Sequence, residues 1–597
     1  MIKILKYLKK YKWSVVLVIF FIAVRGILEL LLPNYMAKLL GQAMEDKTET
    51  SINGIGDFFK LFNSSEWQPI FITAGIMLVI IIFIIILTIL SRYFESKVAS
   101  GFAMELRREV YKKVESFSLD EMDYFTVSSL ITRTTNDIQQ LQGYVNFILG
   151  FLFLQPIMAI GAIVMAIRIN ASLSLVLTVS LVSLLIILIT IFVIILPYFA
   201  KMQKLMDKMN LVTRENLTGL RVVRAHNTQK YQEEKIDKVN LETKKINIFV
   251  GRTAGFLWPT LGLVLGLTSL AIMFFGANHI NFEARTGLNP EELLLLQQYS
   301  SRAIMSLMFI TMIFIMIPRA NVSANRIMEV LDLEPRIKEE SNPVNLEFEK
   351  VRGEVIFNDV TFKYMDADEA VIKNISFKAE AGKTTAFIGS TGSGKSTLIN
   401  LIPRFYDATE GEILIDNIPI NKLSFNSLYS LIGYVPQQGI LFSGTIRDNI
   451  AFGKNSNVET IEKSAEIAQG KEFIESFNDK YDSNISQGGT NVSGGQRQRL
   501  SIARAINKNP KIFIFDDSFS ALDYNTDKKL RQALKDVEAT KLIVAQRINT
   551  IIDADQIIVL NNGVIEGIGT HKELMKTSKV YQEIAYSQLS KEELEDE

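Results

Sequence analysis

Hydrophobic residues are distributed unevenly along the 597-residue chain. Long apolar runs fill the first half and end near residue 330, after which polar and apolar residues alternate over much shorter distances. Six runs reach the about 20 residues that a helix needs to cross the hydrocarbon core of a bilayer. The pattern therefore predicts six membrane-spanning helices, at residues 13–40, 69–91, 145–167, 172–198, 250–275 and 292–317.

Basic residues predict the orientation of these spans, because cytoplasmic segments carry an excess of lysine and arginine. The segments after the second and fourth spans are long and basic. The lysine and arginine residues of the loops after the first and fifth spans are only Lys47, Lys60 and Arg285. We therefore expect both basic segments and both chain ends in the cytoplasm, with the helices continuing beyond the bilayer. Residues 1–12 place lysines between apolar residues and predict a short helix on the cytoplasmic membrane surface.

A polar linker is predicted at 331–350, an α/β domain at 351–585 and a charged tail at 586–597. An expected strand at 385–388 leads into a glycine-rich loop that opens an apolar helix, which is the context of a phosphate-binding P-loop. Its glycines let backbone N–H groups close around phosphates, its lysine reaches the β and γ oxygens, and its serine ligates Mg²⁺. The loop residues are Gly389, Ser390, Thr391, Gly392, Ser393, Gly394, Lys395, Ser396 and Thr397.

Two further motifs follow the P-loop. An apolar strand at 511–515 ends in Asp516, the pattern of a carboxylate that holds Mg²⁺ in ATPases. Between the P-loop and this strand lies a polar sequence that precedes a helical run. It comprises Ser493, Gly494, Gly495 and Gln496. This order of motifs resembles that of ABC transporters, in which Ser-Gly-Gly-Gln is the signature sequence.

The resemblance extends over essentially the whole chain and is to one half of an ABC exporter. It implies an α-helical six-span transmembrane domain at 13–330, followed by an α/β P-loop ABC nucleotide-binding domain. It also implies an adenine-stacking role for Tyr364, a Mg²⁺-linked sensing role for Gln437 and, for Asp523, a place in the loop that faces the opposite ATP site. Residues 124–137 and 219–226 resemble the two intracellular coupling segments of the family.

Two positions depart from the family pattern. Gln546 stands where the family carries a histidine that touches the γ-phosphate, and the three histidines of the chain lie elsewhere. Asp517 stands where the family has its catalytic glutamate. Its side chain is one methylene shorter, which withdraws the carboxylate by about 1–1.5 Å. We therefore expect this site to bind ATP and Mg²⁺ but to hydrolyse ATP poorly.

In such dimers each ATP lies between the P-loop of one chain and the signature of the other, where a helix N-terminus faces the γ-phosphate. The signature here is intact, so the chain resembles the degenerate half of a bacterial heterodimeric exporter of the multidrug type. The resemblance implies a non-identical partner half-transporter with intact glutamate and histidine, and a place in the bacterial plasma membrane. Alternatives are a homodimer in which Asp517 is a slow base, and a regulatory ATP-binding subunit.

The amino-acid composition is consistent with a membrane protein and excludes some other classes of function. The chain is 48% hydrophobic with 21% charged residues and a mean hydropathy of +0.19, which suggests a membrane part joined to a soluble part. A net charge of zero gives no indication of nucleic-acid binding, and the absence of cysteine excludes disulfides and thiol catalysis.

Few charges fall within the predicted spans. Arg25 and Glu29 stand four residues apart and are expected to pair with each other, while Arg302 is a candidate for a water-filled cavity. Methionine and phenylalanine in the spans suit hydrophobic or amphiphilic small molecules. Efflux of lipophilic compounds is therefore the leading function, and flipping of a lipid or lipid-linked precursor is the alternative.

Overall fold

The computed structural model describes residues 2–44, 67–277, 289–365 and 367–588. They form two compact units, Met1–Glu115 with Ser128–Leu333, and Ser116–Val127 with Glu334–Glu597. Lys47, Lys60 and Arg285, on which the predicted orientation partly rests, lie outside the described residues, as does the tail from residue 589 onward.

The first unit confirms the six predicted spans. Six helices in the described residues are long and apolar enough to cross a membrane. They are Lys3–Ala43, Gln68–Glu115, Val127–Ile169, Ser174–Thr218, Gln229–Ala277 and Pro290–Asp332. Their lengths of 41 to 49 residues correspond to about 60 Å or more at ~1.5 Å per residue, twice the ~30 Å of a hydrocarbon core. The helices therefore continue well past any bilayer they cross.

Three of these helices are interrupted. The third contains a π-helical turn at Arg133–Asp137, the fifth is divided at Phe256, and the N-terminal segment predicted at 1–12 is an α-helical turn followed by a 3-10 helix. Lys10 pairs with Glu105 at 3.1 Å, which ties this segment to the second helix. The elements are α1 (Ile2–Leu5), η1 (Lys6–Tyr11), α2 (Lys12–Met44), α4 (Gln68–Glu115), α6 (Val127–Thr132), η2 (Arg133–Asp137), α7 (Ile138–Phe151), α8 (Leu154–Ile169), α9 (Ser174–Thr218), α10 (Leu220–Ala225), α11 (Gln229–Gly255), α12 (Leu257–Ala277) and α13 (Pro290–Asp332).

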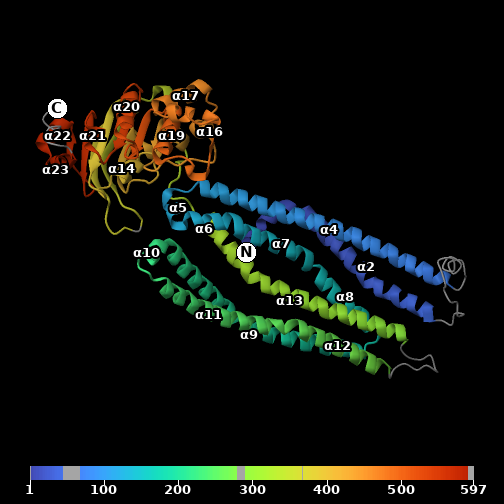
Figure 1. Cartoon of the computed structure of the whole chain (residues 1–597). Helices are drawn as coiled ribbons and strands as arrows, with labels where there is room; N and C mark the ends of the chain where they lie inside the picture. Colours follow the sequence, from blue (N-terminus) through green and yellow to red (C-terminus); the bar gives the residue numbers. More distant parts are fainter. Residues whose placement is uncertain (1, 45–66, 278–288, 366, 589–597) are drawn as a thin grey trace. The chain divides into compact units, whose positions relative to one another are not determined.

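Helix α13 occupies a central place in this unit. It packs against α2, α7 and α8 on one side and against α9 and α12 on the other, as Figure 1 shows. Helix α9 also runs beside α11. The last span is thereby in a position to line any cavity between the two groups of helices.

The second unit is built on two main sheets. One has the strand order β2-β1-β4-β5, and the other has the order β12-β11-β3-β10-β9-β6, with a small pair β7-β8 beside them. The strands are β1 (Val355–Phe362), β2 (Ile372–Ala379), β3 (Thr384–Gly389), β4 (Glu410–Ile415), β5 (Ile418–Pro419), β6 (Ile432–Val435), β7 (Gly444–Thr445), β8 (Asn484–Ile485), β9 (Ile512–Asp516), β10 (Thr540–Val544), β11 (Gln556–Asn561) and β12 (Val564–Gly569).

Helices surround these sheets, and α5 (Leu119–Phe125) joins them from the first half of the chain. The others are α14 (Lys395–Leu401), α15 (Phe425–Leu431), α16 (Ile446–Ala451), α17 (Val458–Ile467), α18 (Lys471–Glu475), α19 (Gly494–Asn507), α20 (Tyr524–Lys535), α21 (Ile548–Ile551), α22 (His571–Thr577) and α23 (Lys579–Gln588). The 3-10 turns are η3 (Phe348–Lys350), η4 (Ile420–Lys422), η5 (Lys480–Asp482) and η6 (Gln487–Gly489). These elements and the six helices of the first unit confirm the predicted fold class.

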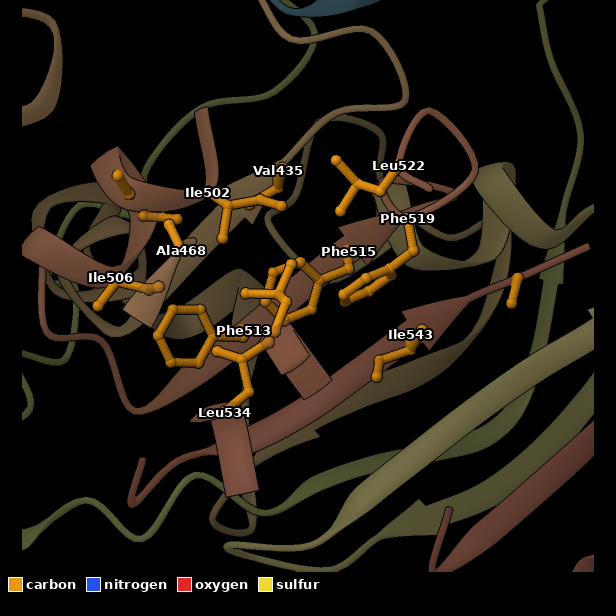
Figure 2. Close-up of a cluster of buried hydrophobic side chains, with 14 of the residues drawn as sticks. Val435, Ala468, Ile502, Ile506, Phe513, Phe515, Phe519, Leu522, Leu534 and Ile543 are labelled. Carbon is orange, nitrogen blue, oxygen red and sulfur yellow. The ribbon is translucent and has the colours of Figure 1, made fainter. Parts of the chain in front are cut away.

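Strand β9 lies between two hydrophobic clusters. Phe513 and Phe515 point into one cluster, while Ile512 and Ile514 point into the other. Figure 2 shows the two phenylalanine rings, whose centroids lie 5.6 Å apart, packed with Phe519 and neighbouring side chains. A parallel strand buried on both faces is held firmly by packing, so the residues that follow it are fixed in place.

Candidate functional site

The P-loop follows β3 directly and opens α14, as the sequence predicts. A Cβ atom on Gly389 would lie 2.0 Å from the carbonyl oxygen of Leu560. Gly394 has a φ of +96°, and its Cβ would meet Ile372 at 2.7 Å. Both positions therefore require glycine, and the loop backbone lies closer to its neighbours than any side chain permits.

The Lys395 side chain folds back onto the P-loop. Its Nζ donates to the carbonyl oxygens of Gly389 at 2.9 Å and Ser390 at 2.7 Å, and to Ser393 Oγ at 3.3 Å. Burial lowers the pKa of the ammonium group, against the opposing effect of nearby Asp517. An ammonium group in such surroundings gains from an anionic ligand, which suits the phosphate-binding role expected for this residue.

Ser396 and Asp516 form a candidate Mg²⁺ site. Ser396 Oγ donates to Asp516 Oδ1 at 2.8 Å, although 120 residues separate them. Burial raises the pKa of Asp516, and the neighbouring Asp517 adds to the rise. A serine hydroxyl and a buried carboxylate are hard oxygen ligands of the kind Mg²⁺ prefers. The residues present therefore fit a Mg²⁺-nucleotide, and a bound cation would favour ionised Asp516.

The carboxyl ends of three parallel strands meet beside this pair. Asp516 in β9 is in register with Val544 in β10, and Phe515 is in register with Val435 in β6. Asp517, Gln546 and Gln437 come one or two residues after these strand ends and so reach the same edge of the sheet. The register thus gathers side chains that the sequence spreads over more than 100 positions.

Asp517 is held by two side-chain amides. Its Oδ2 accepts a hydrogen bond from Gln546 Nε2 at 2.9 Å and one from Gln437 Nε2 at 3.2 Å. The Asp517 side chain is buried, with 7% exposure of the residue, and burial raises its pKa although the hydrogen bond from Gln437 opposes the rise. The two positions that depart from the family pattern are therefore in direct contact with each other.

Tyr364 lies beside the P-loop helix. Its hydroxyl is 2.9 Å from Thr397 Oγ1, and its ring packs edge-on against Phe362 and Tyr406. The structure thus brings Tyr364 together with the loop, as an adenine-stacking residue requires. Within the same loop, Thr391 and Gly392 are exposed.

The signature residues form a separate group at the start of α19. Ser493 caps this helix: its Oγ accepts from the Gln496 backbone at 3.2 Å, while Gln496 Oε1 accepts from the Ser493 backbone at 2.9 Å. Gly495 lies against the Ala521 carbonyl, shortly before Asp523. In the described part of the chain, no hydrogen bond links Ser493 or Asp523 to the P-loop. The signature residues and the P-loop are therefore two separate groups of residues in this chain.

Gln498 connects these two groups and was missed from the sequence. It is 2% exposed, accepts from the Gly439 backbone at 2.9 Å and donates to the Pro436 carbonyl at 3.0 Å. It thereby joins helix α19 to the loop that carries Gln437. A glutamine four residues after a helix start carries no signal of burial, so only the fold reveals this role.

The first of the two expected coupling segments contributes α5 to the second unit. Glu121 accepts from the Ser118 backbone at 2.7 Å and from the Arg336 backbone at 3.0 Å. Burial acts to raise the pKa of Glu121, but its hydrogen bonds from Ser118 and Arg336 outweigh it and the pKa is lowered. Asp120 adds an ion pair to Arg336 at 3.4 Å. The segment predicted as a linker therefore binds α5 through Arg336, by a backbone hydrogen bond and an ion pair.

Arg25 pairs with Glu29 within the first span, as the sequence predicts. The distance from Arg25 Nε to Glu29 Oε1 is 2.7 Å. Arg302 is half-buried on α13.

The second expected coupling segment is helix α10 with its flanking residues, and Val222 within it is 62% exposed. Gly219 precedes this helix and His226 caps its end.

Comparisons with known proteins agree with this architecture. The chain matches the family model of the ABC transporter transmembrane region over residues 15–314 and the ABC transporter model over residues 372–520. An uncharacterized ABC transporter ATP-binding protein of Mycobacterium tuberculosis is 38% identical over 504 residues, covering 83% of this chain and 85% of that protein. The Bacillus subtilis ABC transporter ATP-binding protein YfiB is 34% identical over 504 residues, covering 84% and 87%.

A solved structure has the same fold. The structure of a bacterial Atm1-family ABC exporter with ATP bound is similar to this chain with a TM-score of 0.78, over 97% of this chain and 99% of that one. The identity is 23%, so this likeness shows the arrangement of the polypeptide and nothing about what is carried.

Proposed function

The chain belongs to the ABC transporter family, as an exporter-type half-transporter, and we propose that it works as the degenerate half of a heterodimer. As a family member it is a multi-pass membrane protein whose ATPase domain binds ATP and couples ATP hydrolysis to transport. The proposal assigns tight binding and slow hydrolysis to its own ATP site. The observation that carries it is the contact of both Gln437 and Gln546 with one oxygen of Asp517.

A general base must offer a free carboxylate oxygen to a water in line with the γ-phosphate. The two amides hold Asp517 through Oδ2, which leaves Oδ1 for the water, and the side chain is one methylene short. Misplacement of about 1 Å costs on the order of 10²-fold in rate, and loss of base assistance costs ~10²–10⁴-fold. Gln546 cannot carry the charge or proton of a histidine. Both effects support slow turnover at this site.

Nucleotide binding has the groups it needs. Lys395 and the backbone of Gly389 to Thr397 would hold the phosphates, and Tyr364 would stack on the adenine. Ser396 and Asp516, with Gln437, would hold Mg²⁺, which supplies charge neutralisation when it is bound.

The intact half-site serves the partner. Helix α19 begins at the exposed Gly494 and the half-buried Gly495, whose N–H groups have no partner within the helix, and its dipole favours a negative charge there. We infer that Ser493 to Gln496, with Asp523, complete the catalytic site of a non-identical half-transporter. That partner supplies the true glutamate and histidine. Hydrolysis there resets an alternating-access cycle, while ATP at Asp517 stays bound over several turnovers.

The substrate class follows from the membrane unit. Its spans are apolar, and helices α9, α12 and α13 carry phenylalanine and methionine side chains that adapt to many shapes. We propose ATP-driven efflux of lipophilic or amphiphilic compounds, of the multidrug type, across a bacterial plasma membrane. The ATPase domain and both chain ends lie in the cytoplasm in this proposal.

ATP turnover with and without the partner tests the proposal. The full-length chain is purified alone and then co-purified with the product of an adjacent exporter gene, and Mg²⁺-ATP turnover is measured in both. Negligible turnover alone and rapid turnover together are expected. Rapid turnover by the chain alone, abolished by Asp517→Asn, would instead establish a homodimer with an aspartate base.

A further inference from the structure

An apolar cavity lies between helices α9, α11, α12 and α13 of the membrane unit. Its volume is about 220 Å³, and among its lining residues are Phe192, Phe199, Trp258 and Met308. Thr311 is the one polar residue in the lining, and its hydroxyl donates to the Leu307 carbonyl of its own helix at 3.0 Å. The cavity therefore offers hydrocarbon contact and leaves no polar group in need of a partner.

A larger polar cavity, of about 1210 Å³, follows along the same two helices. Helix α9 lines the first cavity with Phe199 and the second with Gln203, and helix α13 does so with Met312 and Met316. Four residues of helix span about 6 Å. A molecule longer than one helical turn is therefore long enough to extend from the residues that line the apolar cavity to those that line the polar one.

Arg319 stands at the border between the two cavities. It lines the polar cavity, and its guanidinium carbon lies 6.0 Å from the ring centroid of Phe199, which lines the apolar one. Among the residues that the structure describes, no carboxylate lies within ion-pair distance of Arg319. This arginine is thus an exposed cation at the end of a hydrocarbon-lined space.

Each of the other four charged residues of the polar cavity has at least one polar partner, although Oδ2 of Asp137 has none. Arg92 pairs with Glu95 at 2.9 Å, and Arg326 lies 3.9 Å from Asp137. Asp207 accepts from the Gln203 amide at 3.1 Å, and it stands eight residues, or about 12 Å, beyond Phe199 along α9. A head group attached to a tail in the apolar cavity therefore meets Arg319 before it meets Asp207.

We propose that the two cavities bind a single-chain amphiphile with a monoanionic carboxylate head. The tail lies beside Trp258 and the head pairs with Arg319, whose planar donors match a carboxylate. A volume of about 220 Å³ is below the ~300–1,000 Å³ of drug-sized pockets, which favours one hydrocarbon chain over two. This inference rests on the proposed export of amphiphiles and names their class.

Trp258 provides a direct test, because the chain has three tryptophans and the other two can be removed. Full-length Trp13→Phe/Trp67→Phe protein in nanodiscs of zwitterionic lipid is titrated with 11,12-dibromostearic acid, whose bromines quench a nearby indole. Saturable quenching of Trp258 is expected. Arg319→Gln should weaken the affinity about tenfold or more, the usual cost of losing a charge-assisted hydrogen bond. Arg319→Lys keeps the charge but not the planar pair of donors, so it should weaken the affinity less.

Two controls define what would overturn the inference. Arg168→Gln, the same substitution in the last turn of α8, should leave quenching unchanged. Non-saturable quenching would show bilayer partition and refute the site. Equal affinity of the methyl ester or of a brominated alkyl trimethylammonium, or an unaltered affinity of Arg319→Gln, would show that Arg319 does not recognise a carboxylate head and would refute the inference. If Arg319→Gln does not fold, the affinity of the methyl ester and the affinity of the Arg319→Lys variant for the free acid test the inference instead. No nucleotide or partner is needed, so failure here is distinct from failure of the heterodimer, which appears in ATP turnover.

Discussion

Restoring the family residues at the degenerate site should restore its hydrolysis. The perturbation is Asp517→Glu combined with Gln546→His. In the structure Gln546 Nε2 donates to Asp517 Oδ2 at 2.9 Å, so each residue holds the other in its present place. The added methylene advances the carboxylate by about 1–1.5 Å. The imidazole removes one amide from that carboxylate and supplies a group that can carry positive charge at the γ-phosphate.

The expected size of the effect follows from placement of the base. Correcting a displacement of about 1 Å is worth on the order of 10²-fold in rate. Side chains in contact do not act additively. Asp517→Glu alone should therefore gain little while Gln437 and Gln546 still hold the carboxylate, and Gln546→His alone should gain little without a base in reach. The double variant should exceed the product of the two single effects.

The assay isolates this site by inactivating the other. The heterodimer is prepared with the partner's catalytic glutamate replaced by glutamine, and phosphate release is measured at saturating Mg²⁺-ATP. Asp536→Glu, at an exposed position after α20, is the matched control and should change nothing. A double variant no faster than the unmodified chain would refute the reasoning, as would an equal rise in the Asp536→Glu control.

Three further predictions concern other residues of the ATPase unit. Ser493→Ala removes the cap of α19 and should reduce ATP turnover of the heterodimer at least tenfold, because a transition-state contact is lost. ATP binding by the isolated chain should persist. Measurements of equilibrium nucleotide binding and of ATP turnover on the same variant check this. Asp516→Asn keeps the acceptor for Ser396 but removes a buried charge whose pKa is raised by burial. At neutral pH it should raise the melting temperature of the nucleotide-free protein by about 2–4 °C, for about 1 kcal/mol, and weaken Mg²⁺-ATP binding. Because a raised pKa makes the ionised form the costly one, the gain should vanish as pH falls and Asp516 becomes protonated; a lower melting temperature at pH 7 would contradict this. Glu121→Ala removes the acceptor for Ser118 and Arg336 and should cost about 0.5–2 kcal/mol of local stability, the usual cost of a lost cap. This should be seen as faster amide exchange in residues 118–125 with ATP turnover retained.

The parts of the site that are contiguous in sequence were predictable. The P-loop lies between β3 and α14 as expected, and Asp516 ends a strand as expected, because each motif carries its own local pattern of apolar run, glycine and polar residue. The six spans were predictable for the same reason, since a bilayer imposes a long apolar run on every crossing helix. The fold class is therefore confirmed.

The contacts between these parts were not predictable. Gln437 and Gln546 stand 80 and 29 residues from Asp517, and only the register of β6, β9 and β10 decides that their amides share one oxygen of it. The burial of Gln498 and the π-helical turn at Arg133–Asp137 likewise depend on packing against distant helices. No pattern of residue types within either segment indicates them.

The central claim is that this chain binds ATP where it does not hydrolyse it. The most direct measurement is steady-state ATP turnover of the heterodimer with Asp517→Asn, compared with the heterodimer in which the partner's catalytic glutamate is replaced by glutamine. We predict that Asp517→Asn keeps turnover within about twofold, because a group that takes no part in the chemical step does not alter it, while the partner substitution abolishes it. Loss of turnover with Asp517→Asn would contradict the account and identify Asp517 as a working base.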